Sequence, residues 1–452
     1  MAERFDAVVV GAGMAGVSAA FSLAEAGVGR VAIIEEGAPL ALTSDKSSEC
    51  YRNYWPGPDS TMFDFMQDSL RGLEHHARVS GDRFQLRQRG YLFATAREAE
   101  FARMLAEVEQ VSSFGGGAVR MNPTDYRRSP EAGTDPELDG ADVFSDRGAI
   151  AEHFPYLTPD TVGVVHVRWC GMLSAQQLGM YLLETARERG AVLVNARFEG
   201  IETEGGRLAR VICRRDGALV EIETDALVLS PGPHLKSVAK AVGADVPVGV
   251  EKHCKISFSD ARGVIGRDAP LIIWNDPVDL TWSAEEREML AESDETRWLT
   301  ETMPAGFHGR PVGAGDQVVL LWSHNTELLD EPVFPLEPGA FDAEITLRGM
   351  AEVLPGLKAY LDPMPQPYVD GGYYTKTPDN RPLIGPLGVP GTYVCAAFSG
   401  YGIMASPAAG ALIAAHVVGG QLPGYARGLR PERFNDQAYL ASLAGLSRIG
   451  QI

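Results

Sequence analysis

A glycine-rich turn near the start of the chain constrains the fold more than any other feature. The run FDAVVV (residues 5–10) is typical of a buried parallel strand, and GAGMAG follows it at once. The next segment, VSAAFSLAEAG, has helical spacing, and VAIIEE is typical of a second buried strand. This strand–turn–helix–strand order, with glycines at 11, 13 and 16, predicts a βαβ unit that binds a dinucleotide.

Each part of this unit has its own physical role. Gly11 permits the tight turn, Gly13 lets the backbone approach a pyrophosphate, and Gly16 lets helix and strand pack closely. The helix N-terminus turns its positive dipole end toward the phosphates. Glu35 ends the second strand, where a carboxylate accepts hydrogen bonds from ribose hydroxyls. An acid there argues against NADP, but the unit alone does not distinguish NAD from FAD.

Composition and charge narrow the class of protein. The 452 residues carry 40 basic and 60 acidic side chains, a net charge of −20, so the surface repels nucleic acid and anionic membranes. The five cysteines are scattered without CxxC spacing, which argues against a disulfide framework or a metal site and favours a reducing compartment. Residues 7–27 are apolar but lack a preceding basic region, and no run is long enough to span a bilayer. We expect a soluble, cytoplasmic protein that binds no metal, nucleic acid or membrane.

A second glycine-rich turn lies near the C-terminus. YTKTPDNRPLIGP (residues 374–386) precedes a short strand, TYVCAAF, and then SGYGIMASPAAGALIAAHVVGG opens a small-residue helix. No acid follows this turn, so a second adenine nucleotide site is not expected there. The T-P-D-x-x-P-x-I-G stretch with a Gly-x-Gly turn resembles the D-amino acid oxidase superfamily of FAD-dependent oxidoreductases. Its members include glycine oxidase, monomeric sarcosine oxidase and dimethylglycine oxidase.

The resemblance touches most of the chain, in order, and implies an α/β fold with two domains. A Rossmann-like FAD-binding domain with a central parallel sheet is expected to comprise residues 1–80, 150–242 and 366–440. A substrate domain with a mixed or antiparallel sheet is expected at 81–149 and 243–365, with a tail at 441–452. Two stretches fit the family poorly, 124–144 and 276–314, and both are interpreted as insertions into the substrate domain.

The cofactor implied by the resemblance is FAD. The first turn would hold the pyrophosphate, and the second would direct backbone N–H groups at the flavin pyrimidine ring, where negative charge collects on reduction. The expected cofactor-binding residues come from both turns, the second strand and the loops between them. They are Gly11, Gly13, Met14, Ala15, Gly16, Glu35, Glu36, Ser47, Ser48, Phe198, Gly232, Gly372, Gly400, Gly402, Ile403 and Met404.

Departures from the family pattern are informative. Sarcosine oxidase attaches its flavin to a cysteine where this chain has Gly372, and dimethylglycine oxidase uses a histidine in a loop that contains none here, so the resemblance implies noncovalent FAD. Cys50 and Cys395 match no attachment position. Met404 stands where sarcosine oxidase has a lysine that grips the substrate carboxylate, which weakens a simple copy of that substrate grip.

Three residues are the expected catalytic or substrate-binding set. Arg52, in SSECYRNYWPGP, matches an arginine that pairs with the substrate carboxylate, and aromatic neighbours could wall a pocket around it. His324 matches an active-site histidine, in a register that places Leu320 where oxidases have an oxygen-activating lysine. Tyr401, between the glycines of the second turn, should face the substrate side of the flavin. Tyr373 and Tyr374 precede the same region, and one of the three tyrosines is expected to line the pocket. For Arg52 and His324 a purely structural role is an equal alternative.

The leading functional hypothesis is FAD-dependent oxidation of a C–N bond in a secondary amine or amino acid, with N-substituted amino acids favoured. In the family, hydride passes to flavin N5 and gives an imine that water hydrolyses. Alternatives are a 2-hydroxy acid dehydrogenase with an acceptor other than oxygen, and an FAD-holding electron-relay subunit of a larger complex. The expected assembly is a monomer or homodimer, with or without a partner protein that accepts electrons.

Overall fold

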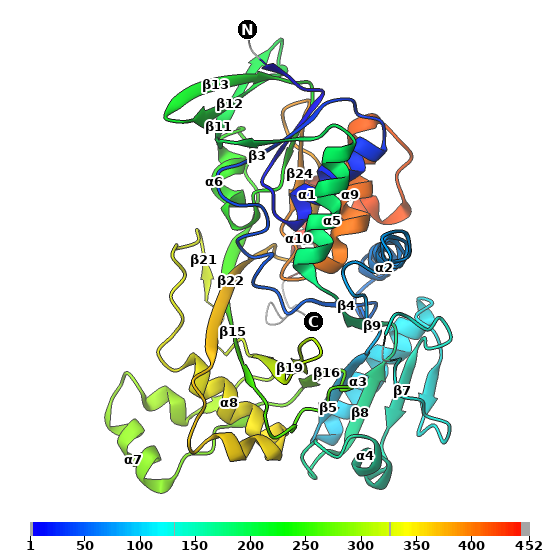
Figure 1. Cartoon of the computed structure of the whole chain (residues 1–452), viewed down its shortest axis with the longest axis vertical. Coiled ribbons are helices and arrows are strands. Elements are labelled where there is room, and N and C mark those ends of the chain that lie inside the picture. Colours follow the sequence, from blue (N-terminus) through cyan, green and yellow to red (C-terminus); the bar gives the residue numbers. More distant parts are fainter. Residues whose placement is uncertain (1–2, 131, 325–326, 444–452) are drawn as a thin grey trace.

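Two large β-sheets organise the chain. The computed structural model describes residues 3–130, 132–324 and 327–443, and within these ranges one sheet has six strands and the other ten. The six-stranded sheet and its helices lie in the upper half of Figure 1, and the ten-stranded sheet lies in the lower half. The long strands β15 (Gly249–Ser259) and β22 (Tyr368–Lys376) run between the two halves.

The six-stranded sheet is largely parallel, with the order β10-β3-β2-β14-β24-β23. Only the pair β23–β24 is antiparallel among its described pairings. Alternate residues of β2 face two different cores, since Val9 packs with the helices and Val8 packs with a smaller sheet on the other side. Burial on both faces explains the continuous Val/Ile runs. The strands are β2 (Ala7–Val10), β3 (Val31–Glu35), β10 (Val192–Asn195), β14 (Leu227–Leu229), β23 (Leu383–Pro386) and β24 (Thr392–Ala396).

Helices cover one face of this sheet and a second, four-stranded sheet covers the other. The helices α1 (Met14–Glu25), α5 (Ala175–Glu188) and α9 (Gly402–Val418) pack together, and α2 (Thr61–Val79) packs against α9. The covering sheet has the order β1-β13-β12-β11. Its strands are β1 (Glu3–Arg4), β11 (Arg197–Glu204), β12 (Arg207–Arg215) and β13 (Ala218–Glu223), and α6 (Leu235–Lys240) lies beside them.

The ten-stranded sheet contains both parallel and antiparallel strand pairs, and one of its faces covers the six-stranded half. We call this sheet the roof. One face packs on α8 (Asp342–Val353) through Ile256 and Leu320, and the other face turns toward the six-stranded half, where Lys255 donates to the Ser47 carbonyl at 2.9 Å. Its strands, besides β15 and β22, are β5 (Tyr91–Thr95), β6 (Val119–Met121), β7 (Ala141–Phe144), β8 (Gly163–Val167), β16 (Leu271–Trp274), β19 (Phe307–Pro311), β20 (Gln317–Leu321) and β21 (Leu328–Leu329). The helices α3 (Glu98–Ser113) and α4 (Arg147–His153) lie at its β5–β8 side.

The strand pairing differs from the expected domain boundaries at two places. β8 lies after the expected boundary at residue 150 but pairs with β5 and β7 of the ten-stranded sheet. β22 lies after the boundary at 366 but pairs along its whole length with β15. Both strands are the last ones before the chain crosses back, and a crossing point has no compositional mark because the sequence stays buried on either side of it.

The expected insertions contain parts of the sheet itself. The stretch 276–314 includes β17 (Val278–Asp279), α7 (Ala284–Glu292) and β18 (Thr302–Met303), but it also includes the sheet strand β19. The stretch 124–144 likewise ends in β7. Of the expected tail, Ala441 and Ser442 end α10 (Gln437–Ser442), and residues 444–452 lie outside the described residues.

Three further observations bear on the expected class of protein. In the described ranges no helix combines the length and apolar character needed to cross a bilayer. All five cysteines are free thiols. Across the same ranges, no cluster of three or more His, Cys, Asp and Glu side chains could hold a metal ion.

Candidate cofactor and substrate site

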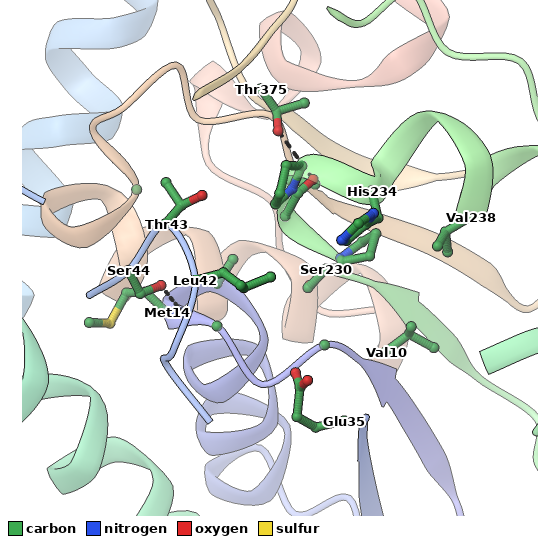
Figure 2. Close-up of a pocket in the computed structure, with 18 of the residues that line it drawn as sticks. Val10, Met14, Glu35, Leu42, Thr43, Ser44, Ser230, His234, Val238 and Thr375 are labelled. Carbon is green, nitrogen blue, oxygen red and sulfur yellow. Dashed lines mark hydrogen bonds between the residues drawn. The ribbon is translucent and has the colours of Figure 1, made fainter. Parts of the chain in front are cut away.

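A cavity of about 780 Å³ lies at the carboxyl edge of the six-stranded sheet, between β2, β3, β14 and β24 and the C-terminal end of β22. Figure 2 shows its lining, with Glu35 and Val10 at one end and Thr375, Thr43 and Leu42 toward the other. The volume lies within the range of ordinary ligand pockets, about 300–1,000 Å³.

The first glycine turn forms the floor of this cavity. Gly11 has φ +98°, and a Cβ on Gly16 would lie 1.8 Å from the Gly11 carbonyl oxygen, so both positions require glycine. Gly13 precedes α1, and a Cβ there would meet only the Ser44 hydroxyl, at 3.4 Å. The turn is therefore closed toward the protein at Gly11 and Gly16 and open toward the cavity at Gly13.

Two side chains fix the ends of this floor. The Glu35 carboxylate accepts hydrogen bonds from the backbone N–H groups of Ala12 and Gly37, each at 2.8 Å, and lines the cavity. Ser44 accepts a hydrogen bond from the Met14 N–H at 2.9 Å, the first backbone donor of α1. Glu35 is thus held beside the turn, with a carboxylate facing the space where a ribose would lie.

The second glycine turn closes the opposite end. Gly400 has φ +88°, and α9 begins at Gly402, with the Ser399 N–H donating to the Thr375 carbonyl of β22 at 3.0 Å. Gly400, Gly402 and Ile403 line the cavity. The N-terminus of a long helix therefore faces this end, as another faces the middle at Gly13, and both favour an anionic ligand.

Most of the expected cofactor-binding residues line the cavity, and four do not. Gly16 lies behind the turn, and Ser48 faces the ten-stranded sheet, where its carbonyl accepts from Arg310 at 2.8 Å. Gly372 lies against Lys46 and Thr43, and Met404 is buried in the helical core, where its carbonyl accepts from Ser69 at 2.7 Å. The expected residues that line it are Gly11, Gly13, Met14, Ala15, Glu35, Glu36, Ser47, Phe198, Gly232, Gly400, Gly402 and Ile403.

Several lining residues were not expected from the sequence. Ser44 belongs to the polar run TSDKSS after the second strand, and this position in the sequence could have predicted that Ser44 lines the cavity. His234 reaches the cavity only through the fold. Tyr373 and Tyr374, two of the three tyrosines of which one was expected at the pocket, both line the cavity, whereas the third, Tyr401, does not. Ser230 follows β14 and packs against the Gly11 turn.

Arg52 and Tyr401 are brought together around one tryptophan. The Arg52 guanidinium lies over the Trp55 ring at 4.4 Å, and the Tyr401 ring meets Trp55 edge-on at 4.9 Å. Arg52 is 5% exposed, and burial lowers the pKa of its guanidinium. The Tyr401 hydroxyl donates to the Asn380 carbonyl. Strand β4 (Cys50–Arg52), paired with β9 (Cys170–Met172), presents Arg52 toward Tyr91 and the ten-stranded sheet.

His324 lies on the other face of the ten-stranded sheet. Its Nε2 is 3.4 Å from the Asp342 carboxylate at the start of α8, and its ring stacks on Trp298. Leu320 points the same way, into the core with α8. The structure therefore does not bring His324 together with Arg52 and Tyr401. On β20 it is Leu321, paired with His308, that lies on the side toward Arg52.

Two histidines that were not in the expected set lie on that side instead. His308 of β19 is near Arg52 and His253, and burial lowers its pKa to about 4. His253 of β15 stacks on Tyr374, with ring centroids 4.0 Å apart, and Tyr374 in turn lines the cavity. Burial also lowers the pKa of His253, so both imidazoles are neutral at physiological pH.

The cavity fits an adenine dinucleotide by three independent features. A Cβ at Gly13 would project into it, two helix N-termini face it, and the Glu35 carboxylate is held at its edge. The second helix N-terminus suits a flavin rather than a nicotinamide, because a reduced flavin carries negative charge on its pyrimidine ring.

Comparison with known proteins agrees with this geometry. A family model described as FAD dependent oxidoreductase matches residues 6–416, which is most of the chain. The chain belongs to this family of FAD-dependent oxidoreductases.

Individual relatives of this FAD-dependent oxidoreductase are distant. Mitochondrial dimethylglycine dehydrogenase of Rattus norvegicus is 23% identical over 449 residues, which cover 96% of this chain but 45% of that protein. The chain therefore spans less than half the length of the curated relative it matches. L-proline dehydrogenase from P. horikoshii has a similar structure, with a TM-score of 0.74, 19% identity and coverage of 96% and 99% of the two chains. Glycine oxidase from Geobacillus kaustophilus also has a similar structure, with a TM-score of 0.70, 17% identity and coverage of 93% of this chain and 96% of that chain. These likenesses show a shared fold.

Proposed function

We propose that the protein oxidises the C–N bond of a secondary amine or an N-substituted amino acid, with noncovalently bound FAD in the cavity between the two glycine turns. The observation that carries the proposal is the buried Arg52 guanidinium, which stacks on Trp55; the Trp55 ring in turn meets Tyr401, which lies between the cavity-lining residues Gly400 and Gly402. The similar proteins support it, since their names are dimethylglycine dehydrogenase, L-proline dehydrogenase and glycine oxidase.

Arg52 would bind the substrate carboxylate. Its planar fork donates two parallel hydrogen bonds to a carboxylate, and the Trp55 ring at 4.4 Å holds the plane of the guanidinium. Met404 supplies no cation, so in this proposal Arg52 takes over the grip that other family members divide between two basic groups. The aromatic rings of Trp55 and Tyr401 would lie beside the alkyl groups on nitrogen.

FAD bound in the cavity would supply a two-electron acceptor for the carbon next to nitrogen. Backbone N–H groups of the two glycine turns would bind the FAD, with Ser44 beside the first turn, and the Glu35 carboxylate would accept hydrogen bonds from the ribose hydroxyls. Noncovalent attachment is favoured because Cys395, although it lines the cavity, has its pKa raised to about 12 by burial and donates to the Ala409 carbonyl. A neutral, buried thiol is a poor nucleophile.

Anaerobic mixing of the FAD-loaded protein with a panel of small molecules tests the proposal. The panel contains N-methylglycine, N,N-dimethylglycine, L-proline, glycine and two 2-hydroxy acids. We expect at least one secondary or tertiary amino acid to bleach the flavin and the hydroxy acids to leave it oxidised. Bleaching by hydroxy acids alone, or by none of the compounds, would contradict it.

A further inference from the structure

A buried network of four polar side chains lies directly behind the flavin end of the cavity. His253 Nε2 is 3.2 Å from Glu251 Oε2, and the Lys376 ammonium donates to the same oxygen at 3.0 Å. Ser323 Oγ lies 2.6 Å from His253 Nδ1. Tyr374 connects the network to the cavity, because its ring stacks on His253 at 4.0 Å and Tyr374 is one of the lining residues.

The fold assembles this network from three separate strands. Glu251 and His253 point to the same face of β15, because they are two residues apart on one strand. Lys376 is on β22, paired antiparallel with β15, and Ser323 follows the end of β20 on the other side of β15. All four side chains therefore meet on the face of the roof that turns toward Arg52.

The hydrogen bonds fix the proton positions at rest. Burial raises the pKa of Glu251, but its contacts with His253 and Lys376 outweigh that effect and hold the pKa below its usual value. An ionised carboxylate only accepts, so His253 Nε2 carries the hydrogen and donates it. His253 Nδ1 is then the bare acceptor, and the Ser323 hydroxyl donates to it.

Burial and two neighbouring charges set the protonation state of His253. Burial lowers its pKa, Glu251 raises it and Lys376 lowers it, and the net pKa is below the usual value. The imidazole is therefore neutral at rest, and on protonation it would keep both hydrogen bonds, one of them to an anion. Lys376 balances the Glu251 charge, so the site does not hold a proton permanently.

Ser323 is the least buried member of the network, and it contacts the His253 nitrogen that does not face Glu251. Glu251, His253 and Lys376 are 6%, 8% and 5% exposed, whereas Ser323 is half-buried. A proton that travels to His253 therefore passes through the Ser323 hydroxyl.

We propose that Ser323, His253, Glu251 and Lys376 form a relay that removes the proton from the substrate ammonium before oxidation. The N–H bond breaks and its electron pair stays on nitrogen; Ser323 Oγ accepts this proton while its own hydroxyl proton moves to His253 Nδ1. The products are a neutral amine and a His253 imidazolium that is hydrogen-bonded to Glu251. The lone pair of the amine then assists the loss of hydride from the adjacent carbon. The relay rests on the proposed amine oxidation, since a 2-hydroxy acid carries no ammonium.

One other neutral base faces the same side. His308 donates through Nδ1 to the Gly306 carbonyl at 3.1 Å, and burial lowers its pKa to about 4. It has no carboxylate contact of the kind that Glu251 gives His253 among the described residues, so its imidazolium would be poorly stabilised. Arg52 is a permanent cation and Tyr374 is a neutral phenol, so neither accepts the proton.

The pH dependence of anaerobic flavin reduction tests the relay, with N-methylglycine or the fastest amine of the panel as probe. The relay predicts an acid limb that reports His253. Lys376→Met removes a cation and should move that limb to higher pH, and Glu251→Gln removes an anion and should move it to lower pH, each by about one unit. Lys376→Arg should keep the wild-type limb. Lys358→Met removes an exposed lysine from a pair with Glu352 and is the matched control.

Opposite shifts in the two variants would support the relay, and an unmoved limb in both would overturn it while leaving the proposed function intact. Failure of every amine to bleach the wild-type flavin would instead overturn the proposed function. Ser323→Ala is the milder variant, and we expect flavin reduction on the order of a hundredfold slower with FAD content unchanged, with partial recovery in Ser323→Thr. NMR titration of His253 in the FAD-loaded protein, assigned with His253→Gln, measures the same pKa shifts without any substrate; no shift in Lys376→Met would overturn the relay.

Discussion

The substitution Gly13→Ala separates cofactor binding from folding. Within the protein the new Cβ would meet only the Ser44 hydroxyl, at 3.4 Å, which is an ordinary contact. Gly13 has φ −72° and ψ 178°, a conformation that alanine adopts without strain. Removing the flexibility of glycine also restricts the unfolded chain, so we expect the free energy of unfolding of the FAD-free protein to stay equal or rise by about 0.5 kcal/mol.

The same methyl group would project into the cavity where the pyrophosphate is expected. Overpacking of this kind costs about 1–3 kcal/mol, which corresponds to FAD binding that is about 5-fold to 150-fold weaker. Gly16→Ala should behave differently. Its Cβ would lie 1.8 Å from the Gly11 oxygen and needs at least 3.0 Å, so α1 and the turn must separate by 1.2 Å, and stability falls together with FAD affinity.

The assay pairs a flavin-fluorescence titration of the FAD-free protein with its urea unfolding curve. Gly388→Ala, on an exposed loop where no atom lies within 4 Å of the new Cβ, is the control for both. If Gly13→Ala binds FAD as tightly as the wild type, the pyrophosphate does not pass this glycine and the reasoning from the turn is refuted.

Three further predictions concern the substrate grip, the cofactor linkage and stability. Arg52→Gln should raise KM for amino acid substrates about a hundredfold with FAD affinity unchanged, and Arg52→Lys should restore little because an ammonium lacks the guanidinium fork; steady-state kinetics would contradict this if KM stayed constant. Acid precipitation of the FAD-loaded protein should leave yellow colour in the supernatant, whereas a yellow pellet would disprove noncovalent binding. Burial raises the pKa of Asp379, but the contacts with Arg433 and Tyr439 outweigh burial and hold the pKa below its usual value. The Asp379–Arg433 pair therefore stabilises the folded state above the pKa that Asp379 has in the unfolded chain. This contribution is lost as the pH falls through the lower pKa of the folded state. Arg433→Met should therefore cost about 3 kcal/mol near pH 7 and progressively less in acid, and an equal loss of thermal midpoint at both pH values would contradict the assignment.

Local patterns predicted the parts of the site that the backbone makes. The strand before Gly11, the helix after Gly13 and the acid at Glu35 lie within one short segment, and each is set by steric or hydrogen-bonding rules that act over a few residues. The second turn at Gly400 was predicted for the same reason, with the help of the family resemblance. These features bring nine of the twelve expected residues that line the cavity to its wall, and the other three, Ser47, Phe198 and Gly232, come from other segments.

The side chains of the roof could not be predicted in the same way. Successive residues of a strand point to opposite faces, so a shift of one residue in the register of β20 exchanges Leu320 for Leu321 and His324 for Ser323. The pairing of β15 with β20 and β22 decides the register, and those strands are far apart in the sequence. For this reason His324 was expected in the site, whereas Ser323 lies on that face of the sheet.

The central claim is that Arg52 holds the carboxylate of an amine beside the flavin. Anaerobic flavin reduction by N-methylglycine compared with dimethylamine, which lacks only the carboxylate, tests it most directly. The account predicts that N-methylglycine reduces the flavin at least about a hundredfold faster at equal subsaturating concentration, since a charge-assisted bidentate contact contributes about 3 kcal/mol. Equal rates for the two amines would contradict it.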